Sequence, residues 1–435
     1  MADRPNILIF FTDQQRWDTV GAYRSPLDLT PNLDAAAREG TLFEQAFTCQ
    51  PVCGPARSCL QTGLYATQTG CWRNAIPLRP EADTIARRLR AAGYETGYLG
   101  KWHLGHRREY EPVPLAERGG WDQFWEAADV LEFASRPFAL RLWDADGHEV
   151  RGRGYRVDSQ TDRAIRFLNL PHEQPWCLMI SYLEPHHQND LKRFVAPPGY
   201  AERYQNAWIP EDLRPFPGDW PSQWAPYCGI IKNLDENYGR LLRELERLGQ
   251  RDNTVVIFVT DHGNHFCTRN EEYKRSCHEG SVRIPLVIHG PGFNHGRRAH
   301  ELVNLVDVPA TVLDVAGAEP TAGMMGRSLK PLAASPGRDW RDDIFIQISE
   351  SGIARAVRTD RWKYCVSAQR PNDTGGSDHY LETHLYDLYA DPHELTNLVG
   401  RRNYRAVADE LKERLLRNMR AAGESEPQIE NGRYR

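Results

Sequence analysis

The chain has 435 residues, of which 40% are hydrophobic and 26% are charged, and its formal net charge is −5. This composition excludes general disorder and fits one large globular domain with a smaller companion. Because neither sign of charge gathers in a long run, we expect no nucleic-acid partner.

Buried strands alternate with helices along most of the chain. Residues 6–13, NILIFFTD, are a continuous apolar run ending in an acid, which is typical of a strand covered on both faces. Residues 30–40 carry a Thr cap, an early Pro and a terminal Gly, which together predict a helix. This alternation predicts a doubly wound α/β fold with a large, mostly parallel sheet. Further predicted elements are a helix at 81–93, a strand entering a loop at 94–105, a helix at 160–170, a strand at 176–187, a helix at 233–250, strands at 254–265 and 283–292, and a helix at 307–317.

The pattern of predicted helices and strands changes near residue 335. Short strand candidates without intervening helices follow, and they predict a smaller antiparallel sheet with one helix at 403–423. We therefore expect two domains, 1–335 and 336–435. Residues 197–226, rich in Pro and Trp, are predicted to form a long surface loop that borders a site. The strand candidates of the second domain are 342–349, 353–360, 361–368 and 384–391.

The N-terminal sequence, residues 1–15, has a short apolar run between polar residues and lacks the small-residue cleavage site of a signal peptide. No stretch of the sequence is apolar for long enough to span a bilayer. We therefore expect a cytoplasmic protein without a membrane partner. Nothing in the sequence indicates an oligomeric state.

Polar residues collect at the carboxyl ends of the predicted strands, where open α/β sheets bind their ligands. Each pair alone is more often a turn former or helix cap than a site. Several such pairs at separate strand ends are harder to explain as caps. Acids, an amide oxygen and an imidazole can enclose a divalent cation, whereas lysine and histidines can bind an anion and move protons. The four pairs are Asp13 with Gln14, Lys101 with His103, His186 with His187, and Asp261 with His262.

The cysteine pattern points to a reactive centre near residue 53. Nine cysteines, an odd number, occur in a chain without a visible export signal, which favours reduced thiols. No C-x-x-C pair is present, so a zinc ribbon is not expected. The cluster CQPVCGPARSCLQTG at 49–63 is therefore better interpreted as a reactive site than as a disulfide staple.

Several motifs in the right order resemble those of the sulfatases of the alkaline phosphatase superfamily. The segment 53–63, CGPARSCLQTG, matches the pattern C-x-P-x-R-x-x-x-x-T-G, with Ala56 where Ser is commoner. The resemblance spans roughly residues 5–399 and implies an alkaline phosphatase-like fold and hydrolysis of sulfuric esters. The other matching blocks are GYLGKWHLG at 97–105, TDHG at 260–263, EEYKRSCHEGSVRIPLVI at 271–288 and LYDLYADPHELTNL at 385–398.

The resemblance implies that Cys53 is the catalytic nucleophile in a modified form. In this family the cysteine is oxidised to formylglycine by a generating enzyme that reads C-x-P-x-R, here including Pro55 and Arg57. One hydroxyl of the hydrated aldehyde attacks sulfur, and the second later expels sulfate. Cys49 and Cys59 match no functional position and are interpreted as packing residues.

The resemblance also implies a divalent cation held by Asp13, Gln14, Asp261 and His262. The common family pattern has a second Asp after the first and an Asn after the third. The ligand set of this chain therefore carries one fewer negative charge, because of Gln14, and includes a nitrogen donor, His262. Imidazole suits Mn²⁺ or Zn²⁺ better than Ca²⁺. The resemblance nevertheless favours Ca²⁺, acting as a Lewis acid on sulfate oxygens.

The remaining catalytic roles follow from the same motif matches. Arg57 resembles the residue that holds the hydrated aldehyde and the metal-binding carboxylates. His186 resembles the histidine at the leaving group, with His187 as the alternative. Lys101 and Lys274 resemble the lysines that neutralise sulfate, and His103 the residue that assists deprotonation of the formylglycine hydroxyl.

Two other functions remain compatible with the sequence. One is a phosphonate monoester or phosphodiester hydrolase of the same superfamily, and the other is a binding protein in which Cys53 stays a thiol. The intact Lys101, His103 and Lys274 argue against the second. The substrate is expected to be a sulfate monoester of an alcohol, an aryl group or a sugar.

Overall fold

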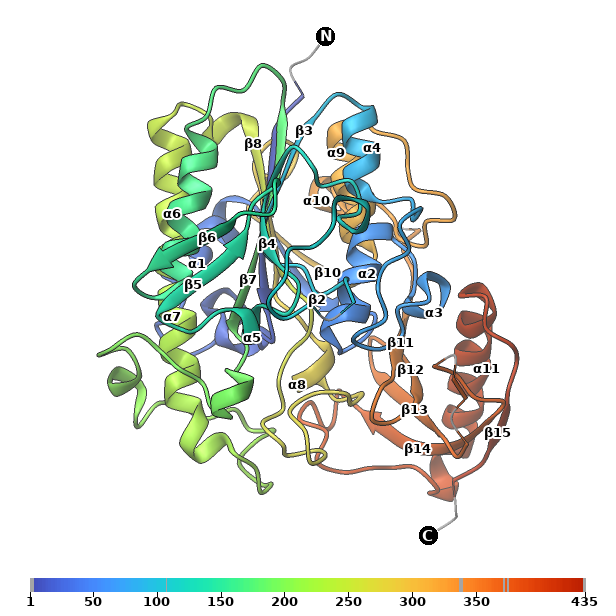
Figure 1. Cartoon of the computed structure of the whole chain (residues 1–435). Coiled ribbons are helices and arrows are strands. Elements are labelled where there is room, and N and C mark those ends of the chain that lie inside the picture. The colour runs from blue at the N-terminus through green and yellow to red at the C-terminus, as the bar shows by residue number, and fades with distance from the viewer. Residues whose placement is uncertain (1–3, 107, 336–338, 371, 374, 433–435) are drawn as a thin grey trace.

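The computed structural model describes residues 4–106, 108–335, 339–370, 372–373 and 375–432. Within these ranges the chain builds a ten-stranded sheet flanked by helices and a separate five-stranded sheet (Figure 1). The expected boundary after residue 335 falls at 336–338, which lie outside the described residues. None of the helices in the described part combines the length and hydropathy needed to cross a membrane.

The large sheet is mostly parallel, as predicted, and its strand order is β10-β2-β9-β8-β1-β7-β3-β4-β5-β6. β1 lies at its centre, parallel to both β7 and β8. β9 is antiparallel to its neighbours, and β5 and β6 extend the far edge as an antiparallel pair. The strands are β1 Asn6–Asp13, β2 Thr41–Phe47, β3 Glu95–Lys101, β4 Phe124–Ala128, β5 Ala139–Trp143, β6 Glu149–Arg153, β7 Trp176–Pro185, β8 Thr254–Thr260, β9 Leu286–His289 and β10 Arg297–Asn304.

Helices cover both faces of this sheet. α1, α6 and α7 pack together on one face, while α2, α4 and α9 pack together on the other (Figure 1). The helices are α1 Pro31–Glu39, α2 Cys53–Thr62, α3 Ala66–Thr69, α4 Ile85–Ala91, α5 Leu131–Ala134, α6 Arg156–Leu168, α7 Trp220–Arg247, α8 Glu279–Val282, α9 Asp307–Ala316, α10 Lys330–Ala334 and α11 Arg405–Ala421.

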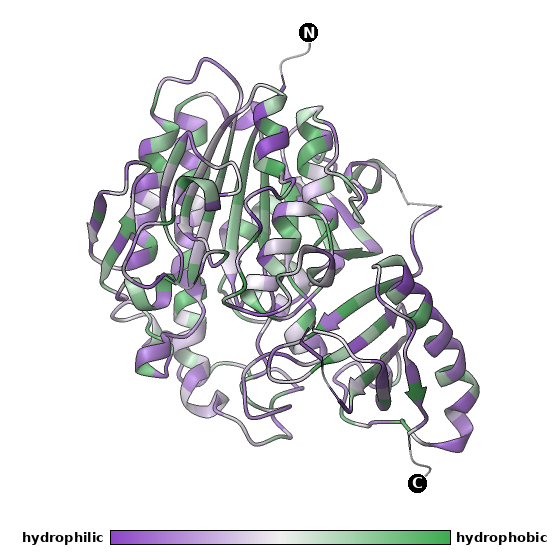
Figure 2. Cartoon of the chain, turned by 45° about the vertical axis from the view of Figure 1, so that its right-hand side comes forward, coloured by the Kyte–Doolittle hydropathy of each residue, from purple (hydrophilic) through white to green (hydrophobic). Residues whose placement is uncertain are grey.

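β1 shows why its sequence is apolar throughout. Ile7, Ile9 and Phe11 belong to the hydrophobic core on one face, whereas Leu8 and Phe10 belong to the core on the other. Side chains alternate across a strand, so a strand covered on both faces needs apolar residues at every position. Each such side chain contributes about 1.5–3 kcal/mol by leaving water. Figure 2 shows this concentration of hydrophobic residues in the central strands.

The smaller sheet contains the predicted antiparallel strands in the order β11-β12-β13-β14, and β15 pairs parallel with β14 at its edge. α11 packs on β11, β12 and β13. The strands are β11 Asp343–Ile348, β12 Ala354–Thr359, β13 Trp362–Ala368, β14 His379–Asp387 and β15 Gln428–Glu430.

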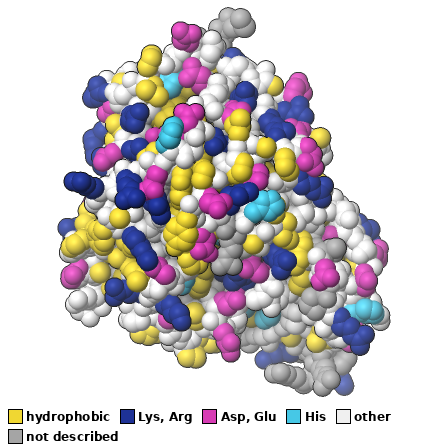
Figure 3. Space-filling view, viewed as in Figure 1, with side chains coloured by type: hydrophobic (Ala, Val, Ile, Leu, Met, Phe, Trp, Pro, Cys, Tyr) yellow, Lys and Arg dark blue, Asp and Glu magenta, His cyan; other side chains and the backbone are white. Residues whose placement is uncertain are grey.

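The surface of the molecule carries charges of both signs. Lys and Arg side chains are intermingled with Asp and Glu over the face shown in Figure 3.

The predicted loop at 197–226 is shorter than expected. α7 begins at Trp220, so the last residues of that range are helical. Pro221 occupies the first turn, where a missing N–H does no harm, and Pro226 lies inside the helix. Trp224 is buried and anchors this early part of α7 in the core. The loop prediction is therefore confirmed for residues 197–219, apart from a short 3-10 segment at Ala201–Tyr204, and wrong for residues 220–226.

Candidate active site

The strand ends of the large sheet bring the predicted site residues together. Asp13 ends β1, Lys101 ends β3, and Asp261 and His262 directly follow β8. Cys53 is the first residue of α2 and points its sulfur at this group of side chains. The positive end of the α2 dipole therefore lies at the same place, which favours a negative charge there.

Cys53 lies in contact with both positive and potentially metal-binding groups. Its Sγ is 2.8 Å from Lys274 Nζ, 3.3 Å from His262 Nε2 and 3.5 Å from Asp13 Oδ1. Burial alone would raise the pKa of the Cys53 thiol, but Lys101, Lys274 and His262 outweigh it and bring the pKa well below its ordinary value. The site is thus electrostatically suited to an anionic nucleophile.

The Asp13 carboxylate is held by two positively charged side chains. Its Oδ2 accepts hydrogen bonds from Arg57 Nη2 at 3.0 Å and from Lys101 Nζ at 2.9 Å. Arg57 Nη1 also donates to the Lys101 carbonyl and to Ser181 Oγ, at 2.9 and 2.6 Å. Burial would raise the pKa of Asp13, but Lys101 and Arg57 contribute to holding it below its usual range. Asp13 Oδ1 remains directed toward Cys53.

Four groups offer ligand atoms within 4.8 Å of one another, and they are the side chains of Asp13, Cys53, Asp261 and His262. His262 Nδ1 lies 2.8 Å from the Gly263 carbonyl, so it carries the proton and leaves Nε2 free as a ligand. All four are buried. A cluster of carboxylates and imidazole without solvent is a chemically suitable cation site.

Buried polar atoms without hydrogen-bond partners also indicate a cation site. The amide nitrogen and oxygen of Gln14 are both buried without a hydrogen-bond partner, as is Asp261 Oδ2. Gln14 also has a φ of 69°, a strained conformation outside glycine. Burial, with the neighbouring Asp13, raises the pKa of Asp261 to about 6. A divalent cation would satisfy these oxygens and offset the carboxylate repulsion, so the residues present fit the metal.

A cavity of about 440 Å³ opens over Cys53. His103 and His186 line it, so both imidazoles can reach a molecule bound there. Lys101 is instead fully buried beside Asp13, with its Nζ 3.3 Å from Glu132 Oε1. The other lining residues are Arg73, Asn74, Ala75, Val130, Glu132, Phe133, Asn189, Tyr273, Lys274, Arg275 and Glu350.

The structure distinguishes the two adjacent histidines. His186 Nδ1 lies 2.7 Å from the His187 carbonyl, and its Nε2 lies 3.2 Å from the hydroxyl of Tyr273 at the cavity. The His187 ring packs on Phe194 and Tyr273, and burial lowers its pKa to about 3. His186 is therefore the histidine that lines the cavity, whereas His187 is not among its lining residues.

Sequence reasoning missed several cavity residues. Tyr273 and Arg275 flank Lys274 within a matching motif block, and this position was an available signal. Glu350 directly follows the predicted strand 342–349, but that strand belongs to the second domain, and Glu132 follows β4, which the sequence did not predict. Glu350 joins the site through Arg275 Nη2, at 2.8 Å, and so brings the C-terminal part of the chain into the cavity wall.

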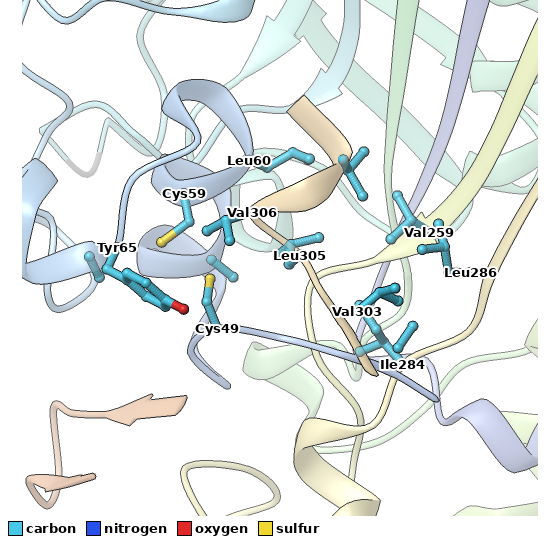
Figure 4. Close-up of a cluster of buried hydrophobic side chains, with 14 of the residues drawn as sticks. Cys49, Cys59, Leu60, Tyr65, Val259, Ile284, Leu286, Val303, Leu305 and Val306 are labelled. Carbon is cyan, nitrogen blue, oxygen red and sulfur yellow. The ribbon is translucent and has the colours of Figure 1, made fainter. Parts of the chain in front are cut away.

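Cys49 and Cys59 lie away from this chemistry, as expected. Both are fully buried in the hydrophobic core, beside Leu60, Tyr65 and Val306 (Figure 4). Burial and hydrogen bonding with Cys49 raise the pKa of the Cys59 thiol well above its ordinary value. These two thiols are therefore unreactive packing groups.

Comparison with known proteins gives consistent matches over the whole chain. The family model described as sulfatase matches residues 5–318, and the model described as N-sulphoglucosamine sulphohydrolase, C-terminal, matches residues 272–421. The chain is 26% identical to an N-acetylglucosamine-6-O-sulfatase of Bacteroides thetaiotaomicron, over 98% of this chain and 88% of that protein.

Two further comparisons agree. An ulvan-active sulfatase of Formosa agariphila is 28% identical, over 97% of this chain and 82% of its own length. A solved structure described as a complex with its substrate D-glucosamine-2-N,6-O-disulfate superposes with a TM-score of 0.79 at 25% identity, over 98% of this chain and 99% of that one.

Proposed function

Because this chain belongs to the sulfatase family and hydrolyses sulfate esters, we propose that its substrate is a sulfated saccharide and its nucleophile a formylglycine made from Cys53. The proposal includes one divalent cation, Ca²⁺, at the strand ends. The observation that carries it is the position of Cys53, at the base of the cavity and in contact with Lys274, His262 and Asp13.

Cys53 meets the requirements for this modification. Pro55 and Arg57 follow it in the pattern that the formylglycine-generating enzyme recognises, which makes that enzyme a partner during maturation. The hydrated aldehyde would supply one hydroxyl to attack sulfur and a second to release sulfate. Lys274, within 2.8 Å of the present sulfur, would face the charge on the transferring group.

The cation would be held by Asp13, Gln14, Asp261 and His262. When bound, it would supply Lewis-acid polarisation of the sulfate oxygens. Arg57 and Lys101 contribute to holding the pKa of Asp13 below its usual range, so that this carboxylate is ionised and able to bind a cation at neutral pH. The predominance of oxygen donors supports Ca²⁺, and the imidazole makes Mn²⁺ and Zn²⁺ the ions to compare with it.

Two histidines divide the proton transfers in this proposal. His103 would take a proton from the nucleophile, because it lines the cavity and its buried Nδ1 has no hydrogen-bond partner. His186 would protonate the leaving oxygen, with its Nε2 directed to Tyr273 at the cavity. Tyr273 therefore positions the imidazole until a substrate replaces this contact.

The saccharide assignment rests on the cavity and on the relatives. Arg73, Asn74, Arg275 and Glu350 surround the mouth with donors and acceptors suited to hydroxyl groups. The relatives named above act on N-acetylglucosamine sulfate and ulvan by their descriptions. An aryl group offers these residues fewer hydrogen-bonding partners than the hydroxyl groups of a sugar do.

The test is a comparison of kcat/KM across matched esters. We expect glucosamine 6-sulfate to exceed a small alkyl sulfate, and a sulfate monoester to exceed a phosphonate monoester with the same leaving group. A preference for the phosphonate ester would favour the phosphonate hydrolase alternative, and equal rates for sugar and small alkyl sulfates would overturn the saccharide assignment.

A further inference from the structure

A second cluster of metal-binding side chains lies away from the active site. The ligand atoms of Cys277, Cys365 and His384 are all within 4.8 Å of one another. Cys277 and Cys365 are each only 2% exposed. From this geometry we propose that the chain binds a second cation, a borderline-soft divalent ion such as Zn²⁺, which links the two sheets.

The backbone brings these residues together from three separate segments. Cys365 on β13 and His384 on β14 are direct cross-strand partners in the smaller sheet, next to a register shift in the pairing. Opposed residues on neighbouring strands place their side chains side by side on one face. Cys277, just before α8, approaches that face from the large domain, and both cysteines belong to the hydrophobic cluster shared by β2, β10, β11 and β12.

The donor set matches zinc chemistry. Thiolate and imidazole are the ligands that zinc prefers, and three protein ligands leave a fourth position for solvent. His384 also lines a large surface cavity, which gives solvent access to this side of the cluster. His384 Nδ1 lies 3.0 Å from Thr383 Oγ1, a hydrogen bond of the kind that fixes a ligating ring.

The charges around the cluster also suit a cation. Lys363, on the same strand as Cys365, contacts Glu279 and Glu394 at 2.7 and 2.6 Å, so its charge is already balanced. A metal ion would bind the two cysteines as thiolates and release their protons.

The cation would act on structure near the active site. Cys277 is three positions after Lys274, whose Nζ contacts Cys53. Fixing Cys277 to β13 and β14 would therefore limit the movement of the segment that presents Lys274. A disulfide between Cys277 and Cys365 would instead leave His384 without a role.

Cobalt is a direct probe of this site. In full-length protein carrying Cys53→Ala, which removes the other thiol near a cation site, about one equivalent of Co²⁺ should give a thiolate-to-cobalt charge-transfer band. Cys277→Ser and Cys365→Ser in the same background should abolish the band. Cys59→Ser, a matched buried thiol without a nearby histidine, and Asp261→Asn, in the other cation site, should keep it.

Two outcomes would overturn the proposal. One is a parent protein without the band, or a band that survives Cys277→Ser. The other is a peptide map showing Cys277 joined to Cys365 by a disulfide. Folding is controlled by a second measurement in the Cys53→Ala, Asp261→Asn background, which disables the active-site cation site: Zn²⁺ should raise the melting temperature of this protein but not that of the same protein carrying His384→Gln.

Discussion

At the scale of single residues, the active site depends on how positively charged side chains surround the buried carboxylate of Asp13. Asp13 Oδ2 takes both Arg57 and Lys101, which leaves Oδ1 free to face Cys53. Removing either Arg57 or Lys101 would leave the buried Asp13 carboxylate with one positive partner instead of two, at a cost of up to about 3–5 kcal/mol. The same arrangement that stabilises Asp13 therefore also directs it toward the nucleophile.

Replacing Cys53 tests the proposed nucleophile. Protein made with the generating enzyme should contain an aldehyde at position 53, detected by mass spectrometry of that peptide. Cys53→Ala should lower kcat/KM at least about 10³-fold, because the attacking group is gone. Cys59→Ala, on the same helix, should cost only about 1 kcal/mol of stability. Active enzyme with an unmodified Cys53 thiol would contradict the mechanism.

His186 and His187 can be separated by leaving-group dependence. His186→Ala should lower kcat/KM for alkyl sulfates by about 10²–10⁴-fold, and for activated aryl sulfates far less, since good leaving groups need little protonation. His187→Ala should change this ratio little, because burial lowers the pKa of His187 to about 3 and keeps it neutral. Equal losses for both ester classes in His186→Ala would remove His186 as the acid.

At the scale of secondary-structure elements, the start of α1 shows a cap supplied by another helix. The sequence predicts Thr30 as the cap, but its hydroxyl donates to Asp34 Oδ1 instead. The Asp235 carboxylate on α7 accepts from the backbone N–H groups of Asn32 and Leu33, at 3.1 and 2.9 Å. A tertiary contact has thus replaced the local cap that the sequence predicts.

This cap should make stability depend on pH. Burial raises the pKa of Asp235 to about 6, so the folded chain binds a proton more tightly than the unfolded one. The resulting stabilisation is complete below the unfolded pKa, near 4, and is lost as pH rises through about 6. As the pH rises between these limits, the unfolding free energy of wild type should fall by about 1–3 kcal/mol relative to that of Asp235→Asn, as measured by urea unfolding. A difference independent of pH would contradict this.

The sequence predicted the buried strands well because their signal is local. Residues 7–11 and 255–259 are apolar throughout, and both lie in central strands. β5 and β6 have no such signal, since they form an antiparallel edge pair in which no residue of β6 is fully buried. β15 is three residues long, and it pairs with β14, a strand that lies far from it in the sequence. Asp235 and Glu350 were missed for the same reason, because only the tertiary fold gives them their partners.

At the scale of the whole molecule, the site joins parts of the chain that are far apart in sequence. Asp13 and Asp261 approach from parallel neighbouring strands, β1 and β8. Glu350, beyond β11, contacts Arg275 and Asn74 and so ties the smaller sheet to the cavity wall. The second matching family model spans residues 272–421, across the expected domain boundary, which accords with this shared wall.

A cation between β1 and β8 should therefore stabilise the whole fold as well as catalysis. Ca²⁺ at 100 times its dissociation constant adds about 2.7 kcal/mol to the unfolding free energy. Chelation should lower activity and melting temperature together, and Ca²⁺ should restore both. Asp261→Asn should reproduce the losses and should not respond to added Ca²⁺, whereas Cys277→Ser should keep the Ca²⁺ response. Full activity in protein shown by elemental analysis to be free of metal would contradict the catalytic cation.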